Sequence, residues 1–197
     1  MVDAAPSPWN AANAVTIARI ALVPLFAWAL LVDGGQTVEW RLVATGIFVL
    51  AAASDRLDGY LARSRGLVTD LGKLLDPIAD KALIGTALVL LWWPLGELPW
   101  WVPVVILARE LGITVMRMAV LKYAVMPASR GGKLKTVLQS VAVTLFLLPL
   151  EHLPGFVGVV AWVVLAAAIA VTVVTGVEYA VQGWRLRREA RRAARLA

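Results

Sequence analysis

Four aspartates, Asp55, Asp58, Asp76 and Asp80, are the residues of this chain whose type and spacing could do chemistry. They stand in a sequence of 197 residues that is 60% hydrophobic. An ionisable side chain at membrane depth costs at least ~2.5 kcal/mol, so four together require a compensating charge or a function. Carboxylate oxygens are the ligands that Mg²⁺ and Mn²⁺ prefer. The run therefore predicts a site for one or two divalent cations.

The first two aspartates share a helix face with an anion site. At about 100° of rotation per residue, Asp55, Asp58, Gly59, Ala62 and Arg63 fall within an arc of about 140°. The small residues at 59 and 62 let a ligand or another helix approach the backbone, and the planar Arg63 guanidinium suits phosphate oxygens. This face is therefore predicted to bind a phosphate group beside the cations.

The second acidic face belongs to the next helix. Gly72, Asp76 and Asp80 recur every four residues and line one side of it. Pro77 either lies in the first turn with Asp76 as cap or kinks a helix begun near Asp70, and both remain open. A short connection makes the two helices neighbours, so the acidic faces are predicted to meet. The alternative, aspartates that only cap helices or pair with cations, suits one aspartate better than four.

The elements that must position these residues are predicted to be membrane-spanning helices. Apolar stretches of about 20 residues match a hydrocarbon layer of ~30 Å. The fold class is therefore all-α integral membrane, one domain over residues 1–197 with a cytoplasmic-side polar cavity. The six transmembrane helices are placed near residues 11–32, 40–63, 73–93, 101–122, 135–150 and 156–182, before a basic tail at 184–197.

The net charge of +6 is concentrated in the C-terminal tail, so a nucleic-acid-binding face is not expected. Basic residues also gather in the second-to-third and fourth-to-fifth connections. This bias predicts a multi-pass protein of the inner or plasma membrane with both termini and the active site cytoplasmic. The chain has no cysteine, which excludes disulfides and thiol catalysis.

In these residues the chain resembles the CDP-alcohol phosphatidyltransferase family. The family signature D-x2-D-G-x2-A-R-x8-G-x3-D-x3-D is matched at every fixed position from Asp55 to Asp80. The resemblance implies a six-helix, homodimeric membrane enzyme that transfers a phosphatidyl group from CDP-diacylglycerol to an alcohol and releases CMP. It implies Asp55, Asp58 and Asp76 as ligands of one Mg²⁺, and Asp55, Asp76 and Asp80 as ligands of a second, with Asp80 also the general base. The residues implied for CDP-diacylglycerol are Gly59, Ala62, Arg63, Thr69 and Gly72.

Outside the signature, the chain is similar to the bacterial branch of that family whose acceptor is sn-glycerol 3-phosphate. The similarity lies in Asn13-x2-Thr16-x2-Arg19, Ala108-Arg109-Glu110 and Gly132-Lys133-x-Lys135-Thr136. A basic cluster at the cytoplasmic surface independently predicts an anionic acceptor. The candidate ligands of its phosphate are Arg109, Arg117, Arg130, Lys133 and Lys135. The polar stripe Asn13, Thr16 and Arg19 on the first span either lines the pocket or packs against another helix.

The sequence alone is compatible with alternative functions. Within the family, a cardiolipin synthase would use phosphatidylglycerol as acceptor, and inositol-phosphate or serine transfer are further choices. A divalent-cation transporter is a more distant alternative, because a transporter would spread acidic groups through the membrane depth. The aspartates of this chain are instead expected to cluster at one level.

Overall fold

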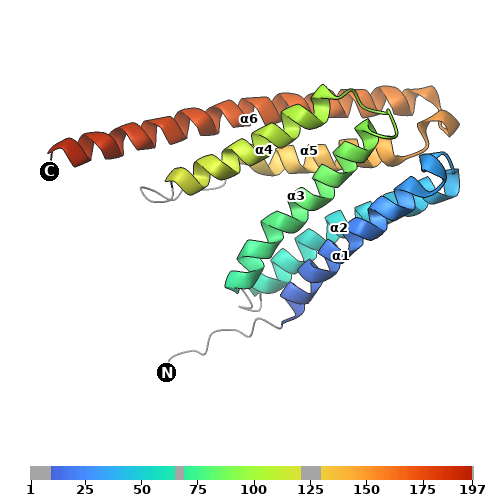
Figure 1. Cartoon of the computed structure of the whole chain (residues 1–197), viewed down its shortest axis with the longest axis horizontal. Coiled ribbons are helices and arrows are strands. Elements are labelled where there is room, and N and C mark those ends of the chain that lie inside the picture. The colour runs from blue at the N-terminus through green and yellow to red at the C-terminus, as the bar shows by residue number, and fades with distance from the viewer. Residues whose placement is uncertain (1–9, 65–68, 121–129, 197) are drawn as a thin grey trace. The chain divides into compact units, whose positions relative to one another are not determined.

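The computed structural model describes residues 10–64, 69–120 and 130–196, and within these ranges the chain is helical without a strand. The predicted all-α class is confirmed. Figure 1 shows the helices α1 Ala11–Leu31, α2 Val38–Ser64, α3 Asp70–Trp92, α4 Trp101–Val120, α5 Arg130–Leu147 and α6 Gly155–Leu196, with short 3-10 helices η1 Val32–Gly35 and η2 Leu150–His152.

The chain divides into two compact units. The first contains Met1–Pro99 and Val143–Gly158, and the second contains Trp100–Ala142 and Val159–Ala197. In the first unit α1 packs against both α2 and α3, and α2 packs against α3 (Figure 1). The expectation of one membrane domain stays a prediction.

The helices expose large apolar side chains and bury polar ones. Arg19 is fully buried, whereas Trp28 and Leu50 are 56% and 62% exposed. Such a surface suits a lipid environment. There, polar groups find their partners inside the protein and apolar side chains face the lipid. Within the described ranges, Asn13–Gly35 and Gly155–Leu186 are long and apolar enough to cross a membrane. The other predicted spans stay predictions.

The N-terminus of α3 is fixed by a capping threonine. Thr69 has an extended backbone, and its Oγ1 accepts a hydrogen bond of 3.1 Å from the Gly72 amide. The helix therefore begins at Asp70, and Pro77 lies inside it rather than in its first turn. Pro77 has no amide hydrogen to give to the carbonyl of residue 73, which weakens the helix next to Asp76.

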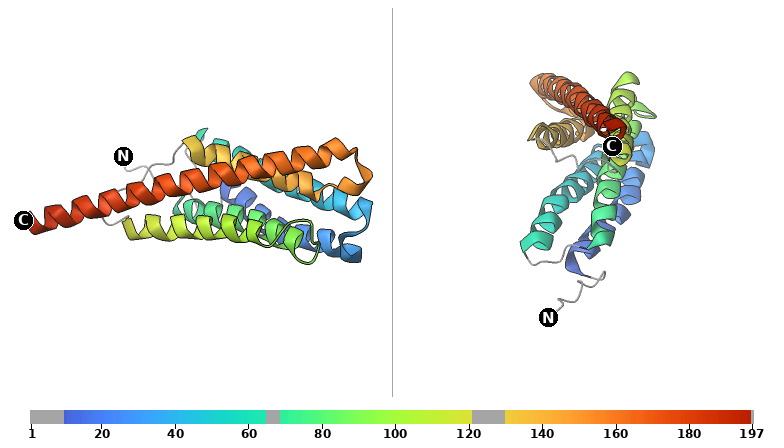
Figure 2. Two further views of the ribbon diagram at one scale, coloured as in Figure 1. Left: turned by 90° about the horizontal axis from the view of Figure 1, so that it is seen from above. Right: turned by 90° about the vertical axis from the view of Figure 1, so that its left-hand side faces the viewer.

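The last helix is longer than the span predicted near 156–182. α6 runs for 42 residues, through most of the basic tail. Figure 2 shows it as one long continuous helix. The apolar sequence ends before the helix does. Arginine and alanine are strong helix formers, so the helix continues beyond the stretch suited to lipid.

Arg41 is a buried cation with a structural role in the first unit. Its Nη1 lies 2.6 Å from Glu97 Oε1, while Nη2 and Nε donate to the carbonyls of Phe146 and Leu147 at 2.8 and 3.3 Å. Those carbonyls belong to the last turn of α5 and have no acceptor role within the helix. Arg41 thus ties the start of α2 to the α3–α4 connection and to the end of α5.

Replacing Arg41 with methionine should lower the free energy of unfolding by on the order of 2 kcal/mol, because Glu97 and two helix-end carbonyls lose their donor. The shift is measured as the apparent Tm of the purified protein in detergent. Glu97→Gln is the matched control and should cost less, since both carbonyl bonds remain. Equal losses in the two variants would contradict the capping role.

Candidate active site

Arg19 joins α1 to the acidic faces of α2 and α3. Its guanidinium is fully buried, and Nη1 lies 2.6 Å from Asp55 Oδ1 and 3.6 Å from Asp80 Oδ1. Its Nε donates to Ser54 Oγ at 3.4 Å. The two carboxylate oxygens are therefore no farther apart than the sum of their distances to Nη1. The predicted meeting of the two acidic faces is confirmed for Asp55 and Asp80.

The other members of the polar stripe on α1 contact α3. Thr16 Oγ1 donates to Asp76 Oδ1 at 2.9 Å, and Asn13 Nδ2 donates to Thr69 Oγ1 at 2.8 Å. Gly72 leaves room for this contact, because a Cβ there would lie 2.6 Å from Asn13 Oδ1. The stripe therefore packs against the helix that carries the signature aspartates, and its role in lining a pocket stays a prediction.

Several predicted site residues lie in helices, but their side chains fall outside the part of the structure that is described. Their roles stay predictions. These residues are Asp58, Gly59, Ala62 and Arg63 in α2, Arg117 in α4 and Arg130 in α5.

The acidic site offers the type of ligand atom that a hard cation prefers. Asp55, Asp76, Asp80 and the Thr16 hydroxyl all offer oxygen. Among the described side chains, no three acidic or histidine groups are close enough to hold a metal ion. Instead, the positive charge between Asp55 and Asp80 is that of Arg19. The residues fit a divalent cation in chemical type, and the arrangement seen is the ion-paired one.

A second polar cluster lies in the other unit and brings together two of the predicted phosphate ligands. Glu110 Oε1 lies 3.2 Å from Arg109 Nη1 and also accepts a hydrogen bond from Lys135 Nζ. Arg109 Nη2 donates to Thr175 Oγ1 at 2.9 Å, and its guanidinium lies 5.8 Å from the ring centre of Tyr179. Its Nε is buried with no hydrogen-bond partner in the described structure. Two cations thus share one carboxylate.

Sequence reasoning missed Thr175 and Tyr179, which hold Arg109 from α6. Between them is Gly176, where a Cβ would lie 3.1 Å from Arg109 Cγ. Polar and small residues at helical spacing within an apolar span are typical of helix contacts and could have found them. Lys133, in contrast, is exposed and outside this cluster of contacts in the described structure.

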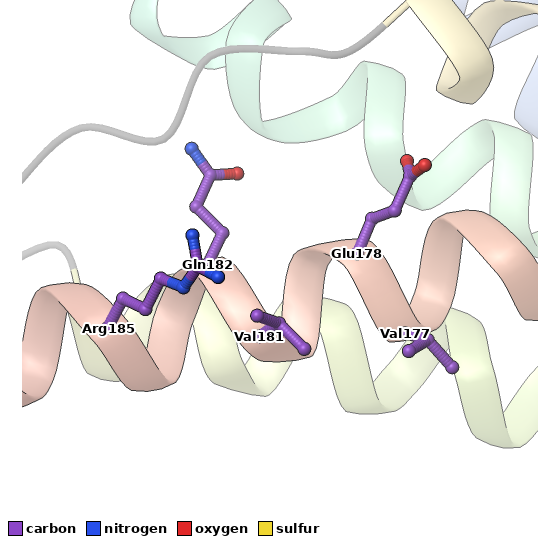
Figure 3. A pocket seen from close by; sticks show the side chains of 5 residues that line it. All are labelled: Val177, Glu178, Val181, Gln182 and Arg185. Atoms are coloured by element: carbon purple, nitrogen blue, oxygen red, sulfur yellow. The ribbon is translucent and has the colours of Figure 1, made fainter.

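Another face of α6 carries a pocket that none of the predicted site residues lines. Figure 3 shows Glu178 and Gln182 projecting to the same side of the helix. The lining residues are Val177, Glu178, Val181, Gln182 and Arg185. All belong to one helix, so this pocket is a shallow surface feature and not a centre assembled from several elements.

Comparison with known proteins identifies the class that the acidic site defines. A sequence profile of the CDP-alcohol phosphatidyltransferase family matches residues 9–174, and the chain belongs to this family. The chain is 53% identical over 176 residues to a probable phosphatidylglycerophosphate synthase of Mycobacterium tuberculosis, covering 89% of this chain and 82% of that one. It is 37% identical over 190 residues to the CDP-diacylglycerol–glycerol-3-phosphate 3-phosphatidyltransferase of Bacillus subtilis, covering 89% and 96%.

A cardiolipin synthase (CMP-forming) of Streptomyces coelicolor matches a shorter part of the chain. The identity is 43% over 107 residues, which is 53% of this chain and 48% of the relative. The family resemblance seen in the signature is therefore confirmed. The matches that cover most of this chain and most of the relative are those to the phosphatidylglycerophosphate synthases, and they indicate that branch of the family.

Gly72→Ala should lower the free energy of unfolding by roughly 1–3 kcal/mol, because the new methyl group pushes the Asn13 amide off Thr69. Adding Asn13→Ala removes the clash, so the double variant should lose less than the sum of the single losses. Apparent Tm values in detergent test this coupling. Gly46→Ala in α2, where nothing lies within 4 Å of the added Cβ, is the control and should be neutral or stabilising. Additive losses at positions 13 and 72 would refute the close approach.

Proposed function

We propose that the protein transfers a phosphatidyl group from CDP-diacylglycerol to sn-glycerol 3-phosphate, giving phosphatidylglycerophosphate and CMP. The observation that carries this proposal is the extent of the matches to relatives named for this reaction. They cover 82% and 96% of those relatives, against 48% of the cardiolipin synthase. The complete signature from Asp55 to Asp80 supports the same donor.

The reaction proposed is a single in-line displacement. Asp80 takes the proton from the sn-1 hydroxyl of the acceptor, and the hydroxyl oxygen attacks the lipid-side phosphorus of CDP-diacylglycerol. The bond from that phosphorus to the oxygen of CMP breaks, and CMP leaves with the electron pair. Asp80 belongs to α3, which α1 also contacts through Thr16 and Asn13, so the backbone that carries Asp80 is held in place for this task.

Asp55, Asp58, Asp76 and Asp80 are the residues proposed to hold divalent cations, two ions of Mg²⁺ or Mn²⁺. When bound, such ions would neutralise the charge of the pyrophosphate. Contacts to CDP-diacylglycerol are assigned to Gly59, Ala62, Arg63, Thr69 and Gly72. Thr69 also caps α3 by accepting a hydrogen bond from the Gly72 amide, and it accepts another from Asn13, so it would contact the ligand while holding the start of the helix.

The acceptor phosphate is assigned to the basic residues of α4 and α5. Arg109 and Lys135 share the carboxylate of Glu110, which leaves one net positive charge, and Arg109 Nε has a free hydrogen. A dianionic phosphate suits such a cluster better than a neutral alcohol does. The further candidates in this set are Arg117, Arg130 and Lys133.

The setting proposed is the inner or plasma membrane, crossed several times, with both termini and the active site cytoplasmic. The exposed apolar helix surfaces and the placement of basic residues in alternate connections support it. A homodimer is proposed from the family resemblance alone.

CMP release by the purified protein is the experiment that tests the function. With CDP-diacylglycerol and Mg²⁺, sn-glycerol 3-phosphate should give CMP and phosphatidylglycerophosphate, whereas phosphatidylglycerol, inositol phosphate and serine should give little. CMP release only with phosphatidylglycerol would favour a cardiolipin synthase. Metal uptake into proteoliposomes in the absence of CDP-diacylglycerol would favour a transporter.

Asp80→Asn should reduce turnover by about 10²-fold or more while CDP-diacylglycerol binding persists, because the amide cannot accept the hydroxyl proton. Turnover is followed by CMP release and binding by equilibrium dialysis of labelled CDP-diacylglycerol. Glu39→Gln is the control, because it also replaces a carboxylate by an amide but at an exposed position of α2. It should leave turnover and CDP-diacylglycerol binding unchanged. If Asp80→Asn kept its turnover but lost CDP-diacylglycerol binding, the assignment of Asp80 as the general base would be wrong.

A further inference from the structure

Arg19 has an unusual position for a buried cation. It places one guanidinium nitrogen against two carboxylates from two helices, Asp55 at 2.6 Å and Asp80 at 3.6 Å. Both carboxylates belong to the set proposed to hold divalent cations. A metal ion and the guanidinium would therefore share the same two carboxylates.

We infer that Arg19 is a displaceable counter-ion that neutralises Asp55 and Asp80 when no divalent cation is bound and competes with the cation for them. This inference rests on the metal requirement in the proposed function. It assigns to Arg19 a positioning role at the acidic site, separate from any contact with substrate.

Charge and geometry both support competition. The 2.6 Å contact is a charge-assisted hydrogen bond that occupies Asp55 Oδ1 along the direction of Nη1. A divalent ion on that oxygen would lie within a few ångströms of a fully buried guanidinium of the same sign, so the two charges would repel each other. This repulsion weakens cation binding while the guanidinium stays in place, so the ion binds more tightly as the guanidinium withdraws.

Arg41 shows how a buried arginine with a structural role differs. It lies in the same unit and also pairs with a carboxylate at 2.6 Å, but it donates its other hydrogen bonds to the carbonyls of Phe146 and Leu147. Those groups hold a helix end and are not ligands in the metal set. The contrast makes Arg41 a matched control for the loss of a buried arginine that does not face the acidic site.

Mn²⁺ binding to the purified full-length protein in detergent, without CDP-diacylglycerol, tests the inference. Free Mn²⁺ is measured by electron paramagnetic resonance. Arg19→Gln should bind Mn²⁺ with an affinity at least about tenfold higher than that of the wild type. The reason is that a nearby positive charge lowers the affinity of a site for a cation by about tenfold or more. Arg19→Lys keeps the charge and should stay within about threefold of the wild type. Arg41→Gln should leave the affinity unchanged.

A purely structural Arg19 gives the opposite result. If the arginine only assembles the site, Arg19→Gln binds Mn²⁺ more weakly, and that outcome overturns the inference. Unchanged affinity in Arg19→Gln overturns it as well. In both cases wild-type binding of Mn²⁺ and CMP release with sn-glycerol 3-phosphate still stand, so the proposed function survives. Absence of Mn²⁺ binding in the wild type overturns the inference and the metal assignment together.

A measurement on the unsubstituted side chain keeps the inference testable if Arg19→Gln does not fold. Adding Mg²⁺ to protein labelled with ¹⁵N-arginine should change the guanidinium bands in the infrared difference spectrum, because Arg19 loses its carboxylate partners. Arg19→Lys should lack this change, and Arg41→Gln should retain it. A wild-type spectrum without guanidinium bands would overturn the inference.

Discussion

In the arrangement that the structure shows, the ion pair between Arg19 and Asp55 organises the first unit. A guanidinium inside an apolar helix needs a partner in the protein, and Asp55 supplies it from α2 while Asp80 adds a longer contact from α3. Thr16 and Asn13 lie on the same stripe and contact α3. Rotating α1 by one residue, about 100°, would separate all of these pairs at once. The pairing thus fixes the relative rotation of three helices and the position of the aspartates.

The helices and the acidic faces could be predicted because both follow from local rules. Apolar length predicted α1 to within a residue, and spacing predicted that Asp76 and Asp80 share a side of α3. The helix α5 begins at Arg130, before the span predicted to begin near 135, because basic residues form helix well outside an apolar stretch. For the same reason α6 extends beyond the span predicted near 156–182.

The partners of individual side chains could not be predicted, because they depend on how distant helices pack. The sequence shows that Arg41 is isolated in its connection, but not that it caps α5 through Phe146 and Leu147. Nor does it show that Glu110 joins Arg109 to Lys135. A common principle links these outcomes: each charged site contains an internal group of the opposite sign. Arg19 offsets part of the acidic charge, and Glu110 offsets part of the basic charge, so each site leaves less net charge in an apolar fold.

The distance in sequence between Arg19 and its partner has a consequence for how the chain is made. Asp55 follows Arg19 by 36 residues, and translation at about 5–20 residues per second supplies it a few seconds later. In a membrane, the first helix would carry an unmatched charge during that interval. Were α2 a membrane span as well, its entry together with α1 as a helical hairpin would avoid this state. The residue that orders the acidic site would then also set the order in which these helices leave the aqueous phase.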